Sequence, residues 1–495
     1  MSRETPQKPN VLLVMADQMT PFLMGAYGHQ VVKTPNLDRL VEGGVRFDSA
    51  YSPCPLCAPA RASMVTGKYV SNIRCYDNAT PLSCDEPTFA HYLSNEGYET
   101  VASGKMHFIG PDQLHGFRTR LTTDIYPSDF KWTKDMLDDR GRKKALRSDF
   151  SHSYKTPNVG VRPWSQGLRY DEETHFRSME YLYDKGQSQD APFLLLVSYQ
   201  HPHEPFHVTK DLWDMYGEAQ IDIPEYPENM EETFSIMDRW LNKWHNVDED
   251  DVKIPEGLYN LRRSYYGLVT YVDNKIGKLI QALEDNGLRD NTIVVFTSDH
   301  GDMLGEKGMV QKRYFYEWSV RIPMIVRFPD GWKRGVKVSQ HVSLMDLMPT
   351  LLDFAGVEEK DRLPVDGKSV MGLIDGSDTS DREVFSEYHI EGVLSPCFMI
   401  RSGKYKYIYI HNEESQLFDL EEDPKELTNL CANPAFRDVE QRLRSQILAE
   451  FDPDDIEKDT VRSLRQRLLI KEAMIENNTR WDYSPKFDAT KQYVR

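Results

Sequence analysis

The sequence predicts an α/β fold in which helices cover both faces of a large, mostly parallel or mixed sheet, with a smaller α+β subdomain at the C-terminal end. Three observations support this fold class: unbroken apolar runs, amphipathic segments between them, and a change to short alternating strands after about Gly376. An unbroken apolar run is typical of a strand that helices cover on both faces. We therefore expect a larger domain over residues 1–376 and a subdomain over residues 377–495.

The expected elements of the larger domain alternate along the chain. Apolar runs predict strands, whereas helical periodicity bounded by a Thr cap or a terminal Gly predicts helices. The expected strands lie at 10–17, 99–105, 192–200 and 291–298, and the expected helices lie at 34–44, 86–97 and 261–287. Such alternation is typical of strands that pair in parallel through helical crossovers.

Two polar stretches interrupt this pattern, at about 137–161 and 225–252. Because they are charged and weakly periodic, we expect them to run over the surface and to form the rim of a cleft. After Gly376 the segments CFMIRSGKYKYIYIH and QLFDLEEDPKELTNL have the composition of short strands, and a charged helical tail follows them.

The charge balance disfavours two classes of partner. The 495 residues include 60 Lys and Arg against 78 Asp and Glu, which gives a net charge of −18. A nucleic-acid backbone or an anionic membrane surface would on average repel such a chain. We therefore expect a small molecule as the ligand, with no nucleic acid and no membrane as a partner.

The first residues, MSRETPQKPN, are polar, and the apolar run that follows them is too short for a membrane span or a signal peptide. Six cysteines in so long a chain do not make the dense disulfide framework of a small secreted module. These features predict a cytoplasmic location.

Reactive side chains stand at the ends of four predicted strands. In open α/β sheets ligands bind beyond the carboxyl ends of the strands, so these positions meet at one edge of the sheet. A single Asp there commonly caps a helix and a single His is commonly structural, but four such strand ends together indicate a site. The residues are Asp17, Lys105, His107, His201, His203, Asp299, His300 and Asp302.

Asp17, Asp299 and His300 indicate a metal site at this edge. Two carboxylates and an imidazole suit a hard or borderline divalent cation, which would attract an anionic ester. The alternative for the segment DHGD, taken alone, is a turn with a capping Asp.

The segment SPCPLCAPARASMVTGKY has three interpretations. Cys54 and Cys57 form a C-x-x-C pair, which is found in redox and zinc sites, but no second pair accompanies it. A buried structural thiol is the second interpretation. The third is a nucleophile, Cys57, that opens a helix, with Arg61 one turn along it.

The spacing C-x-P-x-R-x-x-x-x-T-G in this segment resembles the signature of the type I sulfatases, and here it stands between Asp17 and the later DHG. TPNLDRLVEGGVRF, VSLMDLMPTLLDFAG and QLFDLEEDPKELTNL are also similar to segments of that family, so the resemblance covers nearly the whole chain. It implies an alkaline phosphatase-like fold and the hydrolysis of sulfuric esters.

The resemblance also implies a modification. A formylglycine-generating or other sulfatase-maturating enzyme would oxidise Cys57 to formylglycine, whose hydrate carries two hydroxyls on one carbon. One hydroxyl attacks sulfur, and loss of a proton from the other later releases sulfate and restores the aldehyde.

The resemblance further implies one divalent metal ion, with Ca²⁺ expected first and Mg²⁺ or Mn²⁺ as alternatives. The implied ligands are Asp17, Gln18, Cys57, Asp299 and His300. Many sulfatases have two adjacent acids where this chain has Asp17 followed by Gln18. The site therefore carries one negative charge fewer, although an amide oxygen can still act as a ligand.

The other implied roles are catalytic. Arg61 would hold the nucleophile, and either His107 or His201 would relay a proton. The sulfate oxygens would be held by Lys105, His201 and Lys312.

Within the family, the segment from Ser103 to Trp132 looks most similar to the choline sulfatases, which split choline O-sulfate. A quaternary ammonium prefers an aromatic face and nearby carboxylates. The implied substrate-binding residues are Asn78, Trp132 and Glu391. The C-terminal segment WDYSPKFDATKQYVR suggests a tail that packs on another protomer, so we expect a homo-oligomer, either a dimer or a tetramer.

Several alternatives remain open at the level of sequence. The substrate is choline O-sulfate in the first interpretation, and a sulfated carbohydrate or another alkyl sulfate in the second. A phosphonate monoester or phosphodiester hydrolase would use the same nucleophile and metal. A catalytically silent relative that binds a metal and an anion is the remaining alternative.

Overall fold

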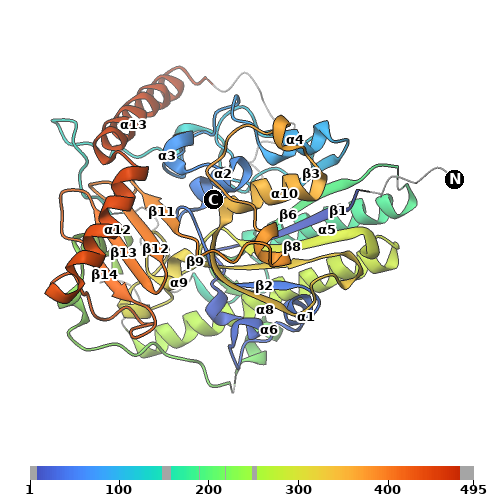
Figure 1. Cartoon of the computed structure of the whole chain (residues 1–495), viewed down its shortest axis with the longest axis horizontal. Coiled ribbons are helices and arrows are strands. Elements are labelled where there is room, and N and C mark those ends of the chain that lie inside the picture. The colour runs from blue at the N-terminus through green and yellow to red at the C-terminus, as the bar shows by residue number, and fades with distance from the viewer. Residues whose placement is uncertain (1–7, 148–157, 189, 218, 248–253, 480–495) are drawn as a thin grey trace.

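The structure is a computed structural model, and it describes residues 8–147, 158–188, 190–217, 219–247 and 254–479. Its centre is an eight-stranded sheet with the strand order β10-β2-β9-β8-β1-β6-β3-β4 (Figure 1). β9 runs antiparallel to both of its neighbours, and every other pair in the sheet is parallel. The predicted fold class, a mostly parallel sheet between helices, is therefore confirmed.

Four of the eight strands of this sheet, β1, β3, β6 and β8, lie close to the predicted positions, and the other four were not predicted. The eight strands are β1 (Asn10–Asp17), β2 (Val45–Tyr51), β3 (Glu99–Gly104), β4 (Thr119–Arg120), β6 (Phe193–Pro202), β8 (Thr292–Ser298), β9 (Arg321–Arg327) and β10 (Val336–Ser343). A separate short pair joins β5 (Val159–Val161) to β7 (Phe206–Val208).

Successive side chains of β1 alternate between two hydrophobic cores. Val11, Leu13 and Met15 enter one core and Leu12 and Val14 enter the other, as the two-residue period of a strand requires. The first core is closed by α2 (Cys57–Thr66), α4 (Phe89–Asn95), α10 (Leu347–Ala355) and α11 (Met371–Asp375). The second is closed by α1 (Pro35–Glu42), α5 (Gln166–Gln187), α6 (Lys210–Met215) and α8 (Pro255–Asp285).

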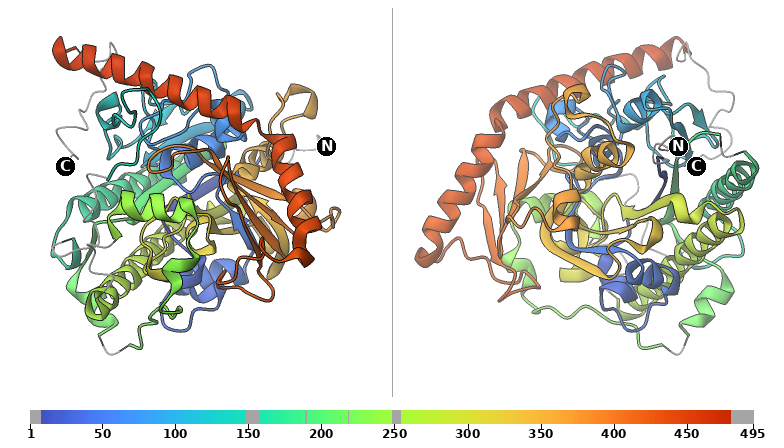
Figure 2. Two further views of the ribbon diagram at one scale, coloured as in Figure 1. Left: turned by 90° about the vertical axis from the view of Figure 1, so that its left-hand side faces the viewer. Right: turned by 45° about the vertical axis from the view of Figure 1, so that its right-hand side comes forward.

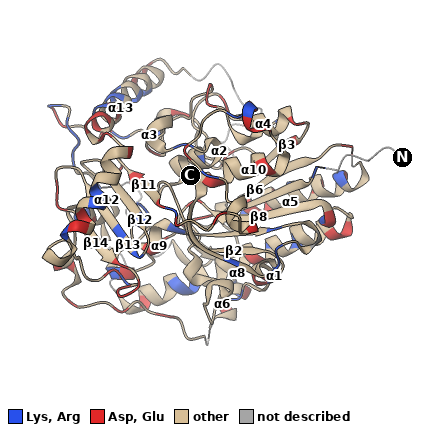
Figure 3. Ribbon diagram, viewed as in Figure 1, with Lys and Arg blue, Asp and Glu red and all other residues tan. Residues whose placement is uncertain are grey.

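Charged side chains stay outside these cores. In Figure 3 the central strands are almost free of charge, and Lys, Arg, Asp and Glu mark the outer helices and loops. The exception in β1 is Asp17, at its carboxyl end. No helix within the described ranges has both the length and the hydropathy needed to cross a bilayer.

The C-terminal subdomain is built on a four-stranded antiparallel sheet, at the left in Figure 1. Its strands are β11 (Val384–Tyr388), β12 (Cys397–Ser402), β13 (Tyr405–Ile410) and β14 (Gln416–Asp419). α12 (Arg437–Glu450) packs on β12 and β13, and α13 (Pro453–Glu476) follows it. The expected tail segment after residue 480 lies outside the described residues, so the oligomer stays a prediction.

The prediction that 225–252 runs over the surface is wrong for α7 (Ile236–His245). Met237, Leu241 and Trp244 are buried in the core of the C-terminal subdomain. Their spacing is helical, but the charged residues between them obscured it in the sequence. The other polar stretch, 137–161, is described only in part. The remaining short helices are α3 (Val70–Ile73) and α9 (Glu317–Val320).

α13 crosses the molecule as a long rod and contacts the 3₁₀ turn Phe130–Trp132 (Figure 2). Arg467 on this helix donates two hydrogen bonds to Asp77, at 2.8 and 2.7 Å. Both side chains are almost fully buried, at 4% and 2% exposure. The C-terminal helix is thereby fastened to the loop that carries Asn78.

Replacing Arg467 with Ala is expected to lower the free energy of unfolding by roughly 3–5 kcal/mol, because it leaves the Asp77 carboxylate buried without its partner. Denaturant unfolding measures this loss. Arg462→Ala is the matched control on the same helix, since Arg462 makes an ion pair with an exposure of 59% on its own side chain. That control is expected to cost less than about 1 kcal/mol; equal losses would contradict the prediction.

Candidate active site

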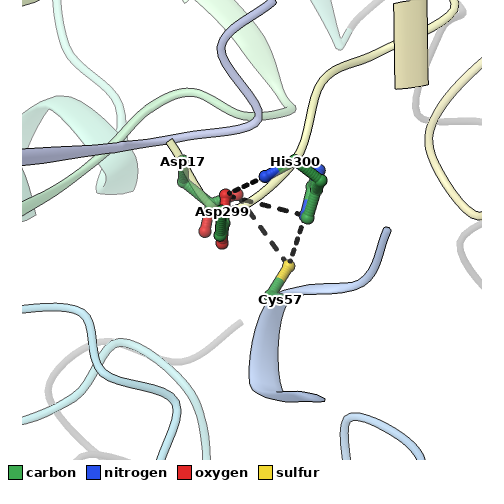
Figure 4. A group of neighbouring side chains, drawn as sticks. All are labelled: Asp17, Cys57, Asp299 and His300. Atoms are coloured by element: carbon green, nitrogen blue, oxygen red, sulfur yellow. Dashed lines mark hydrogen bonds and ion pairs between the residues drawn. The ribbon is translucent and has the colours of Figure 1, made fainter. Parts of the chain in front are cut away.

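Four buried side chains meet at the carboxyl edge of the large sheet (Figure 4). Asp17 ends β1, Asp299 and His300 follow β8, and Cys57 is the first residue of α2. Their ligand atoms all lie within 4.8 Å of one another. The Cys57 Sγ is 3.2 Å from His300 Nε2 and 3.9 Å from Asp17 Oδ1. Two carboxylates, an imidazole and a thiol form a donor set that fits a divalent cation.

Arg61 is fully buried beneath this group. Its Nη2 lies 2.8 Å from Asp17 Oδ2 and its Nε lies 2.9 Å from Asp299 Oδ2. Its Nη1 donates to the carbonyl of Lys105 and to Ser198 Oγ. Because Arg61 stands one helical turn after Cys57, these bonds fix the start of α2 against three strand ends.

The surroundings favour a negative charge at the position of the Cys57 sulfur. Burial opposes ionisation of the thiol, but Lys105, Lys312 and His300 outweigh it and hold the pKa of Cys57 well below its usual value. Burial and Cys57 oppose ionisation of Asp17 too, yet Lys105, His203 and Arg61 lower the pKa of Asp17. A cluster of this kind is suited to binding an anionic group.

Two lysines supply much of this positive charge. The Lys105 Nζ lies 2.6 Å from Asp17 Oδ2 and 4.4 Å from the centre of the Tyr126 ring. Lys105 follows Gly104, whose φ is +94° and where a Cβ atom would meet the Ser198 carbonyl at 2.0 Å, so only glycine fits. The Lys312 Nζ contacts Gln18 Oε1 at 2.5 Å and His203 Nε2 at 2.6 Å.

The structure does not bring His201 into this group, although the sequence suggested it as a sulfate ligand and a proton relay. Its Nδ1 is 2.6 Å from Asp171 Oδ2, and its ring packs against Gly167 and Tyr271. His203 takes the place instead, with its Nε2 3.8 Å from Asp17 Oδ1. The chain leaves the regular strand here, where the register of β1 and β6 shifts after Ala16.

Gln18 follows Asp17 directly, and its side-chain amide contacts three residues around the site. Its amide nitrogen donates to Glu204 at 2.7 Å and to Asp302, and its amide oxygen accepts from Lys312. The contacts of Gln18 therefore orient Lys312. The assignment of Gln18 as a metal ligand stays a prediction.

Three aromatic rings form a cluster next to Lys105. His107 lies 4.7 Å from Tyr126 and 5.8 Å from Trp132, and Tyr126 lies 4.6 Å from Trp132, measured between ring centres. The backbone N–H of His107 donates to Asp124, which Arg120 also contacts. Tyr126 extends this wall toward His203 at 6.3 Å.

Asn78 and Glu391 lie next to the nucleophile helix. Asn78 Oδ1 accepts a hydrogen bond from the N–H of Ala58 at 3.0 Å, and the Asn78 N–H donates to Glu391 Oε1 at 3.0 Å. The other carboxylate oxygen of Glu391 lies 2.5 Å from Arg313 Nη2. Glu391 is thus already in an ion pair within the protein.

With this geometry in view, two family models match the chain. One, described as Sulfatase, matches residues 9–357. The chain belongs to the sulfatase family. A second model, described as N-sulphoglucosamine sulphohydrolase, C-terminal, matches residues 305–452 of this sulfatase-family chain and includes the antiparallel sheet.

Known relatives span nearly the whole sulfatase-family chain. A choline-sulfatase of Rhizobium meliloti is 36% identical and covers 99% of this chain and 96% of its own length. An arylsulfatase of Clostridium perfringens is 32% identical, and the match covers 90% of this chain and 95% of its own length. A phosphonate monoester hydrolase of Agrobacterium radiobacter matches in structure with a TM-score of 0.74 and 25% identity over 89% of this chain and 95% of its own.

Several residues that the structure places at the site were not predicted from the sequence. His203 stands at a predicted strand end, but no role was predicted for it. Tyr126 lies within the segment from Ser103 to Trp132, and it was not among the residues predicted there. Glu204 directly follows His203, and Arg313 directly follows Lys312. Position beside a predicted site residue is the signal that would have found them.

Proposed function

We propose that this protein hydrolyses sulfate esters, with Cys57 acting as nucleophile after conversion to formylglycine by a maturating enzyme. The observation that carries the proposal is the Cys57 side chain, which opens α2 beside His300 and between Lys105 and Lys312. An oxygen nucleophile at that position would lie among groups that stabilise negative charge. Membership of the sulfatase family supports the same chemistry.

Within this proposal the charged groups divide the work. Asp17, Asp299, His300 and the modified Cys57 hold one divalent cation, with Ca²⁺ proposed first and Mg²⁺ or Mn²⁺ as alternatives. Such a cation, when bound, supplies Lewis-acid stabilisation of the transferred group. Lys105 and Lys312 neutralise charge on the sulfate oxygens, and Arg61 keeps the carboxylates and the start of α2 in place.

The proton for the leaving alcohol comes from His203 in this proposal, with His107 as the second candidate. His203 contacts Lys312 and lies near Asp17, whereas His201 is held away by Asp171. A positioned acid matters most for an alkyl ester, because an alkoxide is a poor leaving group.

Two kinds of alcohol compete as the other half of the ester. Choline is supported by the likeness to a choline-sulfatase and by the wall of His107, Tyr126 and Trp132. A carbohydrate or another alcohol rich in oxygen is supported by the ion pair that occupies Glu391. A phosphonate monoester is a further candidate, because a hydrolase of that class has a similar structure.

The experiment that tests the proposed function compares kcat/KM for choline O-sulfate, 4-nitrophenyl sulfate and a 4-nitrophenyl phosphonate monoester on one preparation. A ratio taken on one preparation cancels incomplete conversion of Cys57. We expect release of inorganic sulfate and a mass spectrum in which the Cys57 peptide carries an aldehyde. Preferred turnover of the phosphonate would overturn the sulfatase proposal.

Removal of the divalent cation is expected to lower kcat by at least about 100-fold, since Lewis-acid stabilisation contributes several kcal/mol in metal-dependent hydrolases. The measurement is turnover of 4-nitrophenyl sulfate after treatment with a chelator, followed by titration with Ca²⁺, Mg²⁺ and Mn²⁺ in turn. The ion that restores activity at the lowest concentration identifies the metal. Full activity in the continued presence of the chelator would contradict the metal site.

A further inference from the structure

Four carboxylates around the nucleophile are each matched by a cation of the protein itself. Asp17 pairs with Lys105 and Arg61, Asp299 with Arg61, and Glu204 lies 3.8 Å from Lys312. Glu391 pairs with Arg313 at 2.5 Å. None of these four acids is left to balance the charge of a cationic substrate.

The pair of Arg313 and Glu391 lies next to the segment that carries the nucleophile. The side chains are 8% and 13% exposed, so water screens their attraction only weakly. The backbone N–H of Arg313 donates to the backbone carbonyl of Pro55, two residues before Cys57, at 3.0 Å. Glu391 is linked to the start of α2 through Asn78, which donates to Glu391 and accepts from Ala58.

Arg313 also interacts with Tyr388, but one nitrogen of its guanidinium, Nε, makes no hydrogen bond to the described residues. A guanidinium has five N–H donors in a planar fork. A second nitrogen of Arg313 meets Glu391, and the third meets Gln311 Oε1 at 3.4 Å. Such a group suits an alcohol that brings oxygen acceptors, either hydroxyls or a carboxylate.

We infer that Arg313 is a specificity-determining residue that cancels the charge of Glu391. The site then favours an ester whose alcohol is oxygen-rich and uncharged or anionic, such as a sulfated saccharide, over the ester of a quaternary ammonium alcohol. The inference rests on the proposed function and names its substrate class. Trp132 and Tyr126 then form an apolar face for a sugar ring, which does not require a positive charge.

The test uses a pair of esters that differ in charge and share one shape: choline O-sulfate and 3,3-dimethylbutyl sulfate, in which a carbon replaces the ammonium nitrogen. We expect the wild-type protein to turn over choline O-sulfate no better than its neutral isostere, and glucose 6-sulfate better than either. A wild-type preference for choline O-sulfate of tenfold or more would overturn the inference, whatever the variants do.

Arg313→Met frees the Glu391 carboxylate, and we expect it to raise the ratio of kcat/KM for choline O-sulfate over its isostere by roughly tenfold or more. Arg313→Lys is the matched control, because it keeps a cation beside Glu391, and its ratio is expected to stay near the wild-type value. A loss of packing changes both esters alike and leaves the ratio unmoved. An unchanged ratio in a folded Arg313→Met protein would contradict the role of Arg313.

Binding of the same two esters to the Cys57→Ala protein, measured by calorimetry, separates this inference from the proposed function. If the wild-type protein hydrolyses no sulfate ester but the affinities show the expected order and the expected response to Arg313→Met, the proposed function fails and the specificity assignment stands. If hydrolysis occurs and choline O-sulfate binds at least tenfold more tightly than its isostere, the assignment fails alone.

Discussion

Cys57→Ala is expected to reduce kcat/KM for every sulfate ester by roughly 10⁴-fold or more, the order of loss seen when hydrolases lose a covalent nucleophile. No other described side chain with a nucleophilic atom stands at the start of α2, next to His300 and the carboxylates. The fold should persist, because removing one buried sulfur atom leaves Arg61 and its four hydrogen bonds in place. Initial rates with 4-nitrophenyl sulfate and thermal unfolding measure the two effects.

Cys54→Ala is the matched control for this experiment. Cys54 is a buried thiol three residues earlier, outside the metal-ligand group, and burial raises its pKa well above the usual value. We expect that variant to keep its activity and its aldehyde at Cys57. Appreciable turnover by Cys57→Ala would refute the covalent route, and loss of activity in Cys54→Ala alone would favour the C-x-x-C interpretation.

His203→Ala is expected to lower kcat for an alkyl sulfate by about 10²–10⁴-fold, the usual contribution of a positioned general acid. The loss should be much smaller for 4-nitrophenyl sulfate, because 4-nitrophenolate leaves without a proton. Comparing the two esters on one variant separates proton transfer from general damage to the site. Equal losses on both would show that His203 supports Lys312 and donates no proton.

His201→Ala distinguishes the two histidines of the same strand end. Its ring is hydrogen-bonded to Asp171 and packs on Tyr271, so we expect both esters to be affected alike, through packing. A loss specific to the alkyl ester in His201→Ala, with His203→Ala unaffected, would restore the assignment made from sequence.

The parts of the site that could be predicted from sequence are those fixed by strand ends. Asp17, Lys105 and Asp299 each follow an unbroken apolar run, and the topology of a parallel sheet alone brings such positions together. His201 and His203 could not be separated this way. They are two residues apart, and the strand end alone does not say which one lies beside Asp17 and Lys312, as His203 does in the structure.

The contacts of side chains that pack against distant parts of the chain could not be predicted from the sequence. Glu391 was expected to face a substrate cation, but the structure pairs it with Arg313, 78 residues earlier in the chain. α7 was also hidden, because its buried face meets the C-terminal sheet and not its sequence neighbours. In both cases the partner is non-local, so the sequence does not show which residues these side chains contact.

The hydrogen bonds between Arg467 and Asp77 join an early and a late part of the chain next to the loop that carries Asn78. The two residues are 390 positions apart, so the loop that presents Asn78 to α2 emerges long before the helix that anchors it. All eight strands of the large sheet have been made by residue 343. The large sheet and α2 are therefore complete in the sequence before α13, which supplies Arg467 to the loop that carries Asn78. The surroundings of the nucleophile thus depend on contacts from an early and a late part of the chain.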